Sequence, residues 1–375
     1  MPGLISQAVN SQSNDYQMIF GVANNILALV NEGYFLPVED LPHVNLEKIW
    51  WNKGYIESVS LNSEFPFILF GGITYNNVER TTCMFFNKRL TEVHHGLSDN
   101  DIYDIVLDGD WTLDKFKELA TGIYIDDGNS TNDINDFHGI TMSGKREVEF
   151  VAFSCGLSFT TRDEDGYPVL DLNTNDSVDL AEKLISIFCS EDSFASGSNN
   201  DYVDVKFAGG NALFMPSRLF LAGWGSMREM EDDFGIIPMP KFDENVDQYY
   251  SAVGNAVQWG VVPVTVPDPA LISAAAESLA YEGYHRVIPA YYETSLKLKY
   301  TRGDADVESQ LIDMITEGAR TDFLYMNTLG GIGGIFGACY EAGQNKFASY
   351  YAEREMAANA NLRKLIQTIE DAMAD

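Results

Sequence analysis

The segment that decides the fold is KFAGGNALFMPSRLFLAGWGSMREMEDDFGIIPMP, residues 206–240. Its first apolar run, Asn211–Met215, stops at Pro216, and because proline has no N–H to donate to a ladder, the pattern predicts a strand that ends there. The apolar positions of Leu219–Met230 have the spacing of a short helix. Phe234–Pro240 is again extended and is interrupted by prolines. The segment therefore predicts strand, turn, helix and strand.

Two polar residues follow the first of these strands directly. Ser217 and Arg218 come after the apolar run and before the predicted helix. Ligands of open α/β sheets bind beyond the carboxyl ends of strands. We therefore expect Ser217 and Arg218 to lie at a binding site.

Strands and helices alternate along the rest of the chain. Helices are predicted over Asn24–Asn31 and Asp176–Cys189, and after the Asp268-Pro269 start signal. Further helices are predicted over Val307–Glu317 and Ala357–Met373. Strands are predicted over Gln17–Val22, Phe65–Gly72, Thr81–Lys88 and Ala256–Pro263. This alternation is typical of an α/β protein with mostly parallel sheets.

Length and charge limit the class of protein. The 375 residues predict two domains, with three as the alternative, and a hydrophobic content of 45% indicates a globular chain. The formal net charge of −32 repels phosphate backbones and anionic bilayers, so nucleic acid is excluded as a partner. Four well-separated cysteines, without a C-x-x-C pair, are interpreted as buried thiols, with disulfides or metal binding as the alternative.

The usual catalytic signatures are missing from the sequence. His94-His95 belongs to no H-E-x-x-H pattern, and the sequence has neither a G-x-S-x-G elbow nor a phosphate-binding loop. The glycine-rich run LGGIGGIFG, residues 329–337, lacks the preceding strand of a dinucleotide fingerprint. We interpret it as a turn with close helix packing.

Aromatic residues are abundant, with 22 Phe, 19 Tyr and 5 Trp. Most large rings belong to protein cores. A few stand at predicted strand ends or in polar segments, where a ring can pack on the apolar face of a sugar. These are Tyr75, Trp224, Trp259, Tyr291 and Tyr292. For each of them a place in the core is the alternative.

Several segments carry a resemblance to a known family. The deciding segment contains F-x-x-G-x-A-L-F and RxMExDFGIxPMP, which resemble the second-lobe signature of family 1 extracellular solute-binding proteins, the sugar-binding subunits of ABC importers. Residues 41–55, 81–90, 103–120 and 287–303 resemble further segments of the same family in the same order. The resemblance therefore covers nearly the whole chain.

The resemblance implies a two-lobed periplasmic-binding-protein-like fold of type II, with lobes joined by hinge crossing strands. It places part of lobe one in residues 1–86, lobe two in 87–256, a return to lobe one in 257–305, and helices packing mainly on lobe two in 306–375. An export signal and the opening strands of lobe one are expected upstream.

The resemblance also implies a function. The protein is expected to be a non-enzymatic, monomeric, extracytoplasmic subunit without a cofactor, either a cell-surface lipoprotein or periplasmic. It is expected to bind a small carbohydrate between its lobes and deliver it to the transmembrane permease subunits. Lobe closure by hinge bending accompanies binding in such proteins.

Transferred to this sequence, the resemblance implies cleft residues on both lobes and on the crossing strands. They are Gly21 and Asn24 on lobe one, Glu79, Arg80 and Thr81 before the first crossing strand, Ser217 and Arg218 on lobe two, and Asn255 and Trp259 at the returning strand. Tyr75, Trp224 and Tyr291 complete the predicted ligand-binding set.

One acidic loop, residues 126–138, resembles the calcium loop of many such binding proteins. Its candidate oxygen donors are Asp127, Asn129, Asp133 and Asp136. The turn glycine and the closing bidentate glutamate of an EF-hand loop are missing. A structural calcium site and a solvated acidic loop both remain open.

Two other functions compete with sugar import. The first is a binding or sensor module of the same fold for a peptide or polyamine, since an acidic cleft attracts cations. The second is a glycan hydrolase, which needs two carboxylates about 5–10 Å apart across a cleft. The sequence offers no such pair.

Overall fold

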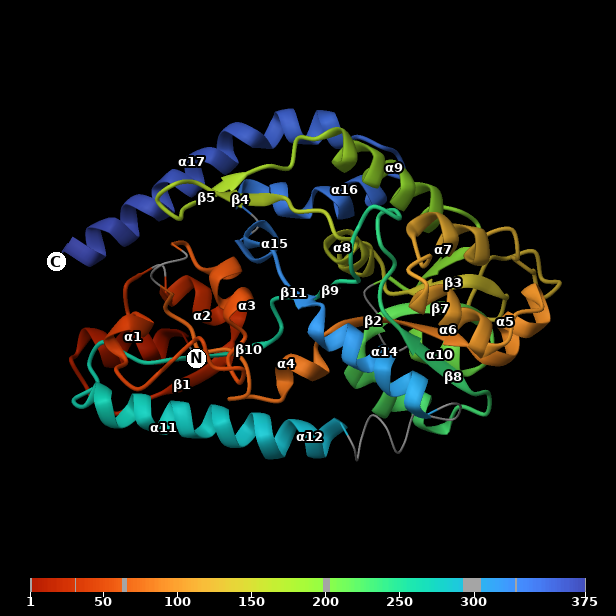
Figure 1. Ribbon diagram of the computed structural model, residues 1–375. Helices are drawn as coiled ribbons and strands as arrows, with labels where there is room; N and C mark the ends of the chain where they lie inside the picture. Colours follow the sequence, from red (N-terminus) through yellow and green to blue (C-terminus); the bar gives the residue numbers. More distant parts are fainter. Residues whose placement is uncertain are drawn as a thin grey trace.

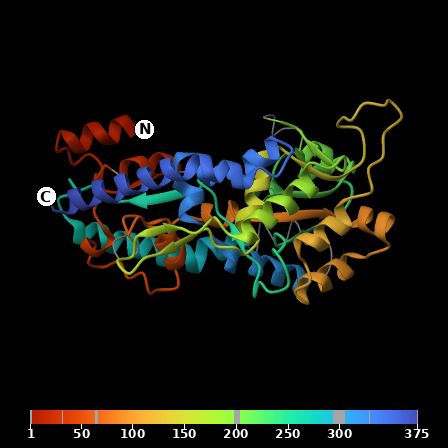
Figure 2. The same cartoon turned by 90° about the horizontal axis from the view of Figure 1, so that it is seen from above.

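The computed structural model describes residues 2–30, 32–62, 66–197, 203–292, 305–327 and 329–374. Two bodies lie side by side and are joined by extended segments between them (Figure 1). Seen from above, the molecule is elongated, and both ends of the chain lie on the side of the first body (Figure 2). None of the described helices combines the length and the apolar character that crossing a membrane requires.

Lobe one is built around a two-stranded antiparallel sheet. Strand β1 (Ile19–Val22) pairs with β10 (Gln258–Val261), which comes from a distant part of the chain. The surrounding helices are α1 (Pro2–Asn10), α2 (Ala23–Val30), η1 (Val38–Asp40), α3 (Lys53–Val59), α4 (Asn76–Glu79), α11 (Pro269–Glu282), η5 (Gly283–Val287) and α12 (Ile288–Tyr291). Tyr55 stacks on Phe70 at a centroid distance of 3.8 Å in the lobe core.

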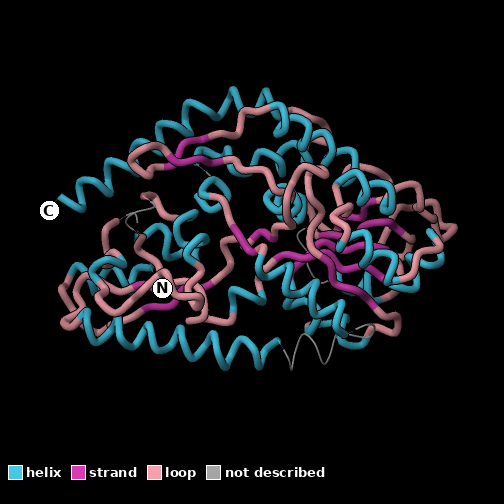
Figure 3. The backbone as a smooth tube through the Cα atoms, viewed as in Figure 1, coloured by secondary structure: helices cyan, strands magenta, loops and turns pink. Residues whose placement is uncertain are grey.

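Lobe two contains a five-stranded sheet with the order β6-β3-β7-β2-β8. Its strands are β2 (Thr82–Asn87), β3 (His138–Met142), β6 (Ser193–Ala195), β7 (Ala212–Arg218) and β8 (Phe234–Ile237). Its helices before residue 230 are α5 (Lys88–His95), α6 (Asp99–Leu107), α7 (Leu113–Ala120), α8 (Lys145–Ser154), α9 (Asn175–Phe188), α10 (Val203–Ala208), η3 (Leu219–Gly223) and η4 (Gly225–Glu229). Figure 3 shows this sheet gathered in one lobe.

Short strands and the carboxyl-terminal helices connect the two bodies. Strand β9 (Ser251–Ala252) pairs in parallel with β11 (Ala319–Arg320), and β4 (Thr160–Arg162) forms a hairpin with β5 (Pro168–Leu170). The last helices are α14 (Ala305–Glu317), α15 (Phe323–Asn327), η7 (Leu329–Gly334), α16 (Ile335–Glu341) and α17 (Phe347–Ala374). Helix α17 runs from lobe two over toward lobe one (Figure 1).

The two-lobed α/β fold is confirmed, but its sheets are mixed rather than mostly parallel. Strand β3 is parallel to β6 and β7, whereas β2 is antiparallel to both β7 and β8. Strand β2 enters lobe two from lobe one, so it runs against its neighbours. The predicted domain boundaries stay predictions.

Three details of the sequence prediction are wrong. Strand β7 continues through Pro216 to Arg218, because its register with β3 reaches only Phe214 and Pro216 pairs with β2 alone. The predicted helix at Leu219–Met230 is two 3₁₀ turns. In the predicted strand Phe65–Gly72, Leu69 and Gly71 form isolated bridges, and Phe65 lies outside the described residues.

The cysteine prediction is confirmed for three of the four thiols. Cys83, Cys155 and Cys339 are buried, whereas Cys189 is exposed; all four are free. Cys189 is the C-cap residue of α9 and so lies beyond its apolar face.

Candidate functional site

A cavity of about 240 Å³ lies where the crossing segments meet lobe two. Two segments that link the lobes contribute to it, the α4–β2 turn and the β9–β10 connection. The rest comes from α8, the end of β7, α15 and η7. Its lining residues are Arg80, Arg146, Glu149, Phe150, Arg218, Gly254, Asn255, Ala256, Tyr325, Gly333 and Gly334. The cavity is therefore lined both by lobe two and by segments that link the lobes.

Strand pairing brings two of its arginines together. Arg218 ends β7 and is paired with Thr82, and Arg80 precedes Thr82 by two residues. The guanidinium carbons of Arg80 and Arg218 lie 4.6 Å and 5.3 Å from the ring centroid of Phe220. Phe220 therefore contacts both cations.

A second ring extends this arrangement. The guanidinium carbons of Arg218 and Arg146 lie 5.4 Å and 6.0 Å from the centroid of Phe150. Three arginines and two phenylalanines thus alternate from Arg80 to Arg146, and we call this set the arginine ladder. Cation–π contacts of this kind contribute about 0.5–2 kcal/mol each.

The three arginines differ in how their charges are compensated. Arg146 donates to Glu147 from Nε at 2.9 Å and from Nη2 at 2.8 Å. Arg80 and Arg218 each have a buried Nε without a hydrogen-bond partner. Within the described ranges, neither of their side chains forms an ion pair. Burial, followed by the charges of Arg146 and Arg80, lowers the pKa of Arg218 to about 10.

Glu149 is the carboxylate in the lining of this cavity. Burial raises its pKa to about 7, opposed by Lys145. A Cβ placed on Gly337 would lie 2.5 Å from Glu149 Oε1, so a side chain at this position would displace the Glu149 carboxylate. The predicted turn with close packing at the glycine-rich run is confirmed, since Gly330 (φ 61°) and Gly331 (φ 82°) have left-handed conformations.

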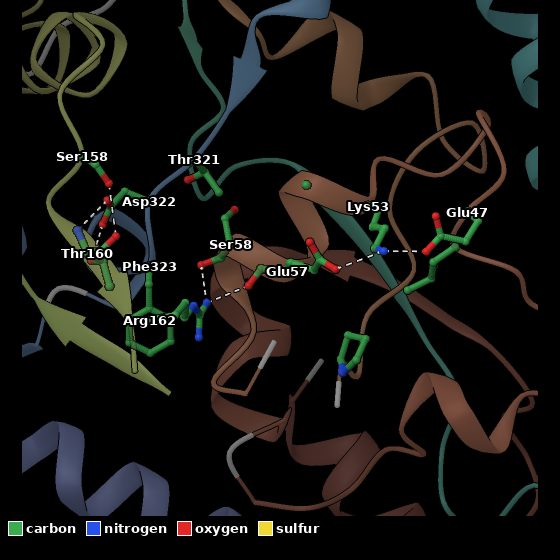
Figure 4. A pocket seen from close by; sticks show the side chains of 13 residues that line it. Glu47, Lys53, Glu57, Ser58, Ser158, Thr160, Arg162, Thr321, Asp322 and Phe323 are labelled. Carbon is green, nitrogen blue, oxygen red and sulfur yellow. Dashed lines mark hydrogen bonds and ion pairs between the residues drawn. The ribbon is translucent and has the colours of Figure 1, made fainter. Parts of the chain in front are cut away.

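A second cavity of about 660 Å³ lies between α3 of lobe one and the β4–β5 hairpin (Figure 4). Arg162 donates to the carbonyl oxygens of Glu57 and Ser58 at 2.7 Å and 3.1 Å. Asp322 accepts from Thr160 Oγ1 at 2.6 Å and from two further backbone N–H groups of this region at 3.1 Å and 3.2 Å. Lys53 pairs with Glu47. The principal charged groups of this larger cavity are therefore already bound to protein atoms.

Five predicted ligand-binding residues line the first cavity or the one beside it. Arg80, Arg218 and Asn255 line the 240 Å³ cavity. Ser217 and Trp224 line an adjoining cavity of about 150 Å³, whose lining also includes Arg218. Trp224 is 66% exposed there, so it is not part of the core.

Three other predicted residues are buried elsewhere. Trp259 is only 1% exposed, and its indole N–H donates to the Tyr55 hydroxyl at 3.2 Å in the core of lobe one. Gly21 is paired with Trp259 in the same sheet and is likewise buried. Thr81 is 1% exposed, and its hydroxyl donates to the carbonyl of Asn77. The structure therefore places these residues in supporting roles.

The remaining predicted residues lie outside both cavity linings. Asn24 is exposed at the start of α2, where its N–H donates to the carbonyl of Asn255. Glu79 is half-buried beside Asn76, and burial raises its pKa. The rings of Tyr75 and Tyr291 lie 5.7 Å apart and contact each other. As ligand-binding residues, these four stay predictions.

Sequence reasoning missed Arg146, Glu149 and Phe220. The first two lie on α8, directly after strand β3. The sequence pattern that could have identified Arg146 and Glu149 lies in residues 143–147. There a strand is followed by Ser-Gly and charged residues, and polar residues beyond a strand end also mark the site in residues 206–240.

The acidic loop is closed by its own hydrogen bonds. Asp136 is buried and accepts from Tyr124 Oη and from the N–H groups of Asp127 and Asp133. The buried ammonium of Lys206 donates to the carbonyl of Asp136 at 2.6 Å. Carboxylate oxygens of Asp126, Asp127 and Asp136 lie within 4.8 Å of one another, a group that includes two of the predicted donors but not the carboxylate of Asp133.

Sequence comparisons give no match. No protein-family model matches the chain. No curated protein matches it either.

Comparison with solved structures does find similar folds. The maltose/maltodextrin-binding domain MalE from Bdellovibrio bacteriovorus, bound to maltotriose, is 12% identical with a TM-score of 0.54, covering 100% of this chain and 89% of that one. An ABC transporter solute-binding protein from Thermotoga lettingae, bound with α-D-tagatose, is 14% identical with a TM-score of 0.57, covering 97% and 88%. UgpB from Mycobacterium tuberculosis, in complex with glycerophosphocholine, is 12% identical with a TM-score of 0.52, covering 100% and 88%. The chain therefore has the two-lobed fold of maltodextrin-binding and related solute-binding proteins.

Proposed function

We propose that this protein is the extracytoplasmic carbohydrate-binding subunit of an ABC importer. It binds a sugar or short oligosaccharide between its lobes and delivers it, unaltered, to the permease subunits. It is exported and then held at the cell surface as a lipoprotein or retained in the periplasm. The proteins of similar fold described above are binding proteins, and two of them are bound to sugars.

The observation that carries this proposal is the position of the 240 Å³ cavity. Arg80 and Asn255 belong to two different segments that pass between the lobes, whereas Arg218 and Glu149 belong to lobe two. A ligand in this cavity contacts both kinds of element, so its binding energy favours one arrangement of the lobes. The volume lies just below the range of about 300–1,000 Å³ common for small-molecule sites, which favours a small ligand.

The charges of the cavity favour a carbohydrate over the cationic ligands of the competing binding function. A peptide amine or a polyamine requires carboxylates, but three arginines line this cavity beside Glu149. This lining therefore does not favour a cationic ligand, although the whole chain is acidic. A hydrolase requires two facing carboxylates. Glu149 is the single carboxylate in this lining, and Glu147, in the adjoining one, is paired with Arg146.

A saccharide panel tests the proposal. The full chain is titrated calorimetrically with neutral mono- and oligosaccharides, acidic sugars and sugar phosphates, and bound ligand is recovered and analysed for chemical change. We expect saturable binding of at least one saccharide, a smaller radius of gyration on binding, and recovery of unaltered ligand. Absence of binding across the panel, or recovery of a cleaved sugar, contradicts the proposed function.

A further inference from the structure

We propose that the ligand of this cavity is an anionic saccharide, whose carboxylate or phosphate group is bound by Arg80 and Arg218. The inference rests on the proposed function for the saccharide part of the ligand. Its anionic part rests on the arginine ladder. The two parts are tested separately below.

First, Arg80 and Arg218 lack a negatively charged partner among the described residues. In a chain with 56 acidic and 24 basic residues, cations are easily paired, yet Arg80 and Arg218 lack an ion pair within the described part of the chain. Each also has a buried Nε without a partner. A buried guanidinium is costly unless it is hydrogen-bonded. An anionic ligand group supplies the acceptor that both side chains lack.

The second argument is geometric. Both guanidiniums contact Phe220, so they converge on one ring from two neighbouring segments. Arginine presents a planar fork that matches carboxylate and phosphate oxygens. Two such forks fixed by cation–π contacts provide a rigid anion receptor, because their conformations are set before the ligand arrives.

The third argument is the shortage of accessible rings in the cavity. Binding of a neutral sugar depends on aromatic faces, but Phe150 is 3% exposed and Tyr325 is 9% exposed. Trp224 is 66% exposed but lines the adjoining cavity instead. Gly333 and Gly334 carry no side chain at all. A ligand in this cavity therefore binds mainly through charge-assisted hydrogen bonds to the arginines. Trp224, in the adjoining cavity, contacts the rest of the saccharide.

The test compares matched pairs of ligands. Isothermal titration of the wild-type chain uses glucuronate against glucose, galacturonate against galactose, and glucose 6-phosphate against glucose. Acidic di- and trisaccharides of the uronates, with their neutral counterparts, form a second set. We expect at least one acidic member to bind about 10- to 100-fold more tightly than its neutral partner, as charge-assisted hydrogen bonds predict. Carboxylate and phosphate arms separate the two sources of the anion.

Variants then assign the effect to the ladder. Arg80→Gln and Arg218→Gln should each weaken binding of the acidic ligand about 10- to 100-fold, and Arg218→Lys should weaken it less, because charge remains while the fork is lost. Arg286→Gln is the matched control: Arg286 is a highly exposed arginine that pairs with Glu282 on lobe one, away from the cavity lining, and binding should be unchanged.

Thermal unfolding of the ligand-free chain distinguishes a binding role from a structural one. An arginine that only stabilises the fold lowers Tm markedly when it is replaced, whereas Arg218→Gln should change Tm little, because removal of a buried charge without a partner at Nε offsets the loss of its two cation–π contacts. A marked fall in Tm contradicts the binding role.

Each outcome separates the two proposals. Equal binding of neutral and acidic saccharides overturns the anionic ligand and leaves the proposed function standing. Binding of non-sugar anions, such as glycerol 3-phosphate or citrate, without any saccharide overturns the proposed function and supports the anion receptor. Binding by neither class contradicts both.

Discussion

The two cavities between structural units differ in how their charged groups are used. In the 660 Å³ cavity between α3 and the β4–β5 hairpin, Arg162 donates to backbone carbonyls and Asp322 accepts from backbone and hydroxyl donors. In the 240 Å³ cavity, Arg80 and Arg218 have buried nitrogens without partners. The charged side chains named in the larger cavity have protein partners, although the buried hydroxyl of Thr321 there has none, whereas two arginines of the smaller cavity each have a buried Nε without a partner.

This difference shows that buried polar groups without hydrogen-bond partners indicate a binding site better than the volume of a cavity does. Native proteins pair most of their buried polar groups, so a converging set without partners indicates a group supplied from outside. Replacing charged residues in the larger cavity should reduce stability, and replacing them in the smaller one should reduce binding.

The largest expected effect is at Asp322. Its carboxylate accepts from the N–H groups of Phe159, Thr160 and Leu324 and from Thr160 Oγ1. Asp322→Ala leaves these donors without an acceptor in a buried region, which should cost about 3–5 kcal/mol of unfolding free energy. Denaturation in urea measures the loss.

Two further variants check that assignment. Asp322→Asn retains one oxygen acceptor and should lose less stability than Asp322→Ala. Asp247→Ala removes an exposed carboxylate and should change stability by less than about 0.5 kcal/mol. Equal stability of Asp322→Ala and wild type would show that the hairpin contact contributes nothing.

The next effect contrasts two half-buried arginines directly. Arg162 donates to the carbonyls of Glu57, Ser58, Leu61 and Gly166, so it satisfies the last carbonyls of α3 and joins lobe one to the hairpin. Arg162→Met should lower the unfolding free energy by about 2–3 kcal/mol. Arg218→Met should lower it less, because removal of a buried charge without a partner at Nε offsets the loss of its two cation–π contacts. Urea denaturation of both variants side by side tests the contrast, and similar losses at the two positions would remove it.

The sequence predicted the smaller cavity only in part, for physical reasons. Arg218 and Ser217 were found because a strand end is visible as an apolar run followed by polar residues. Trp259 was predicted to line the cleft, because its position on the returning strand does not reveal which face of β10 its ring occupies. Its indole N–H donates to the Tyr55 hydroxyl in the core of lobe one.

Side chains from other elements were beyond the reach of local patterns. Phe220 belongs to the site only because the guanidiniums of Arg80 and Arg218 contact its ring, and Arg80 is distant from it in the sequence. The arrangement depends on the antiparallel register of β2 and β7, which sequence periodicity does not fix. The fold itself was more predictable, since it follows from the order of many apolar segments.

A smaller effect concerns pH and Glu149. Burial raises its pKa to about 7, so its charge increases as pH rises from 6 to 8. The ionised form repels a ligand carboxylate, which stays charged over this range. Affinity for an acidic saccharide should therefore fall by about 3- to 10-fold between pH 6 and pH 8.

Calorimetry across this pH range provides the measurement, and Glu149→Gln should make the profile flat. The other charged or titratable groups that face Glu149 are Lys145, Arg146 and Glu147 on its own helix, Glu341 on α16 and Tyr325 on α15. Burial raises the pKa of Tyr325, so its hydroxyl stays neutral between pH 6 and 8. A pH dependence that persists in Glu149→Gln assigns the titration to another group.

The smallest effect is expected at the acidic loop, where the same bonding argument gives the opposite result from the arginine ladder. Asp136 already accepts two hydrogen bonds from within its loop and one from Tyr124, and Lys206 donates to its carbonyl and to that of Ile134. A calcium ion has to compete with these donors and with a neighbouring ammonium. We therefore expect 1 mM CaCl₂, compared with EDTA, to shift Tm by less than about 1 °C, since weak binding gives little stabilisation by mass action. Differential scanning calorimetry could instead show a shift of several degrees that Asp127→Asn abolishes. In that case a site whose groups are already hydrogen-bonded to protein atoms can still bind a ligand, and unpaired groups no longer distinguish the smaller cavity from the larger one.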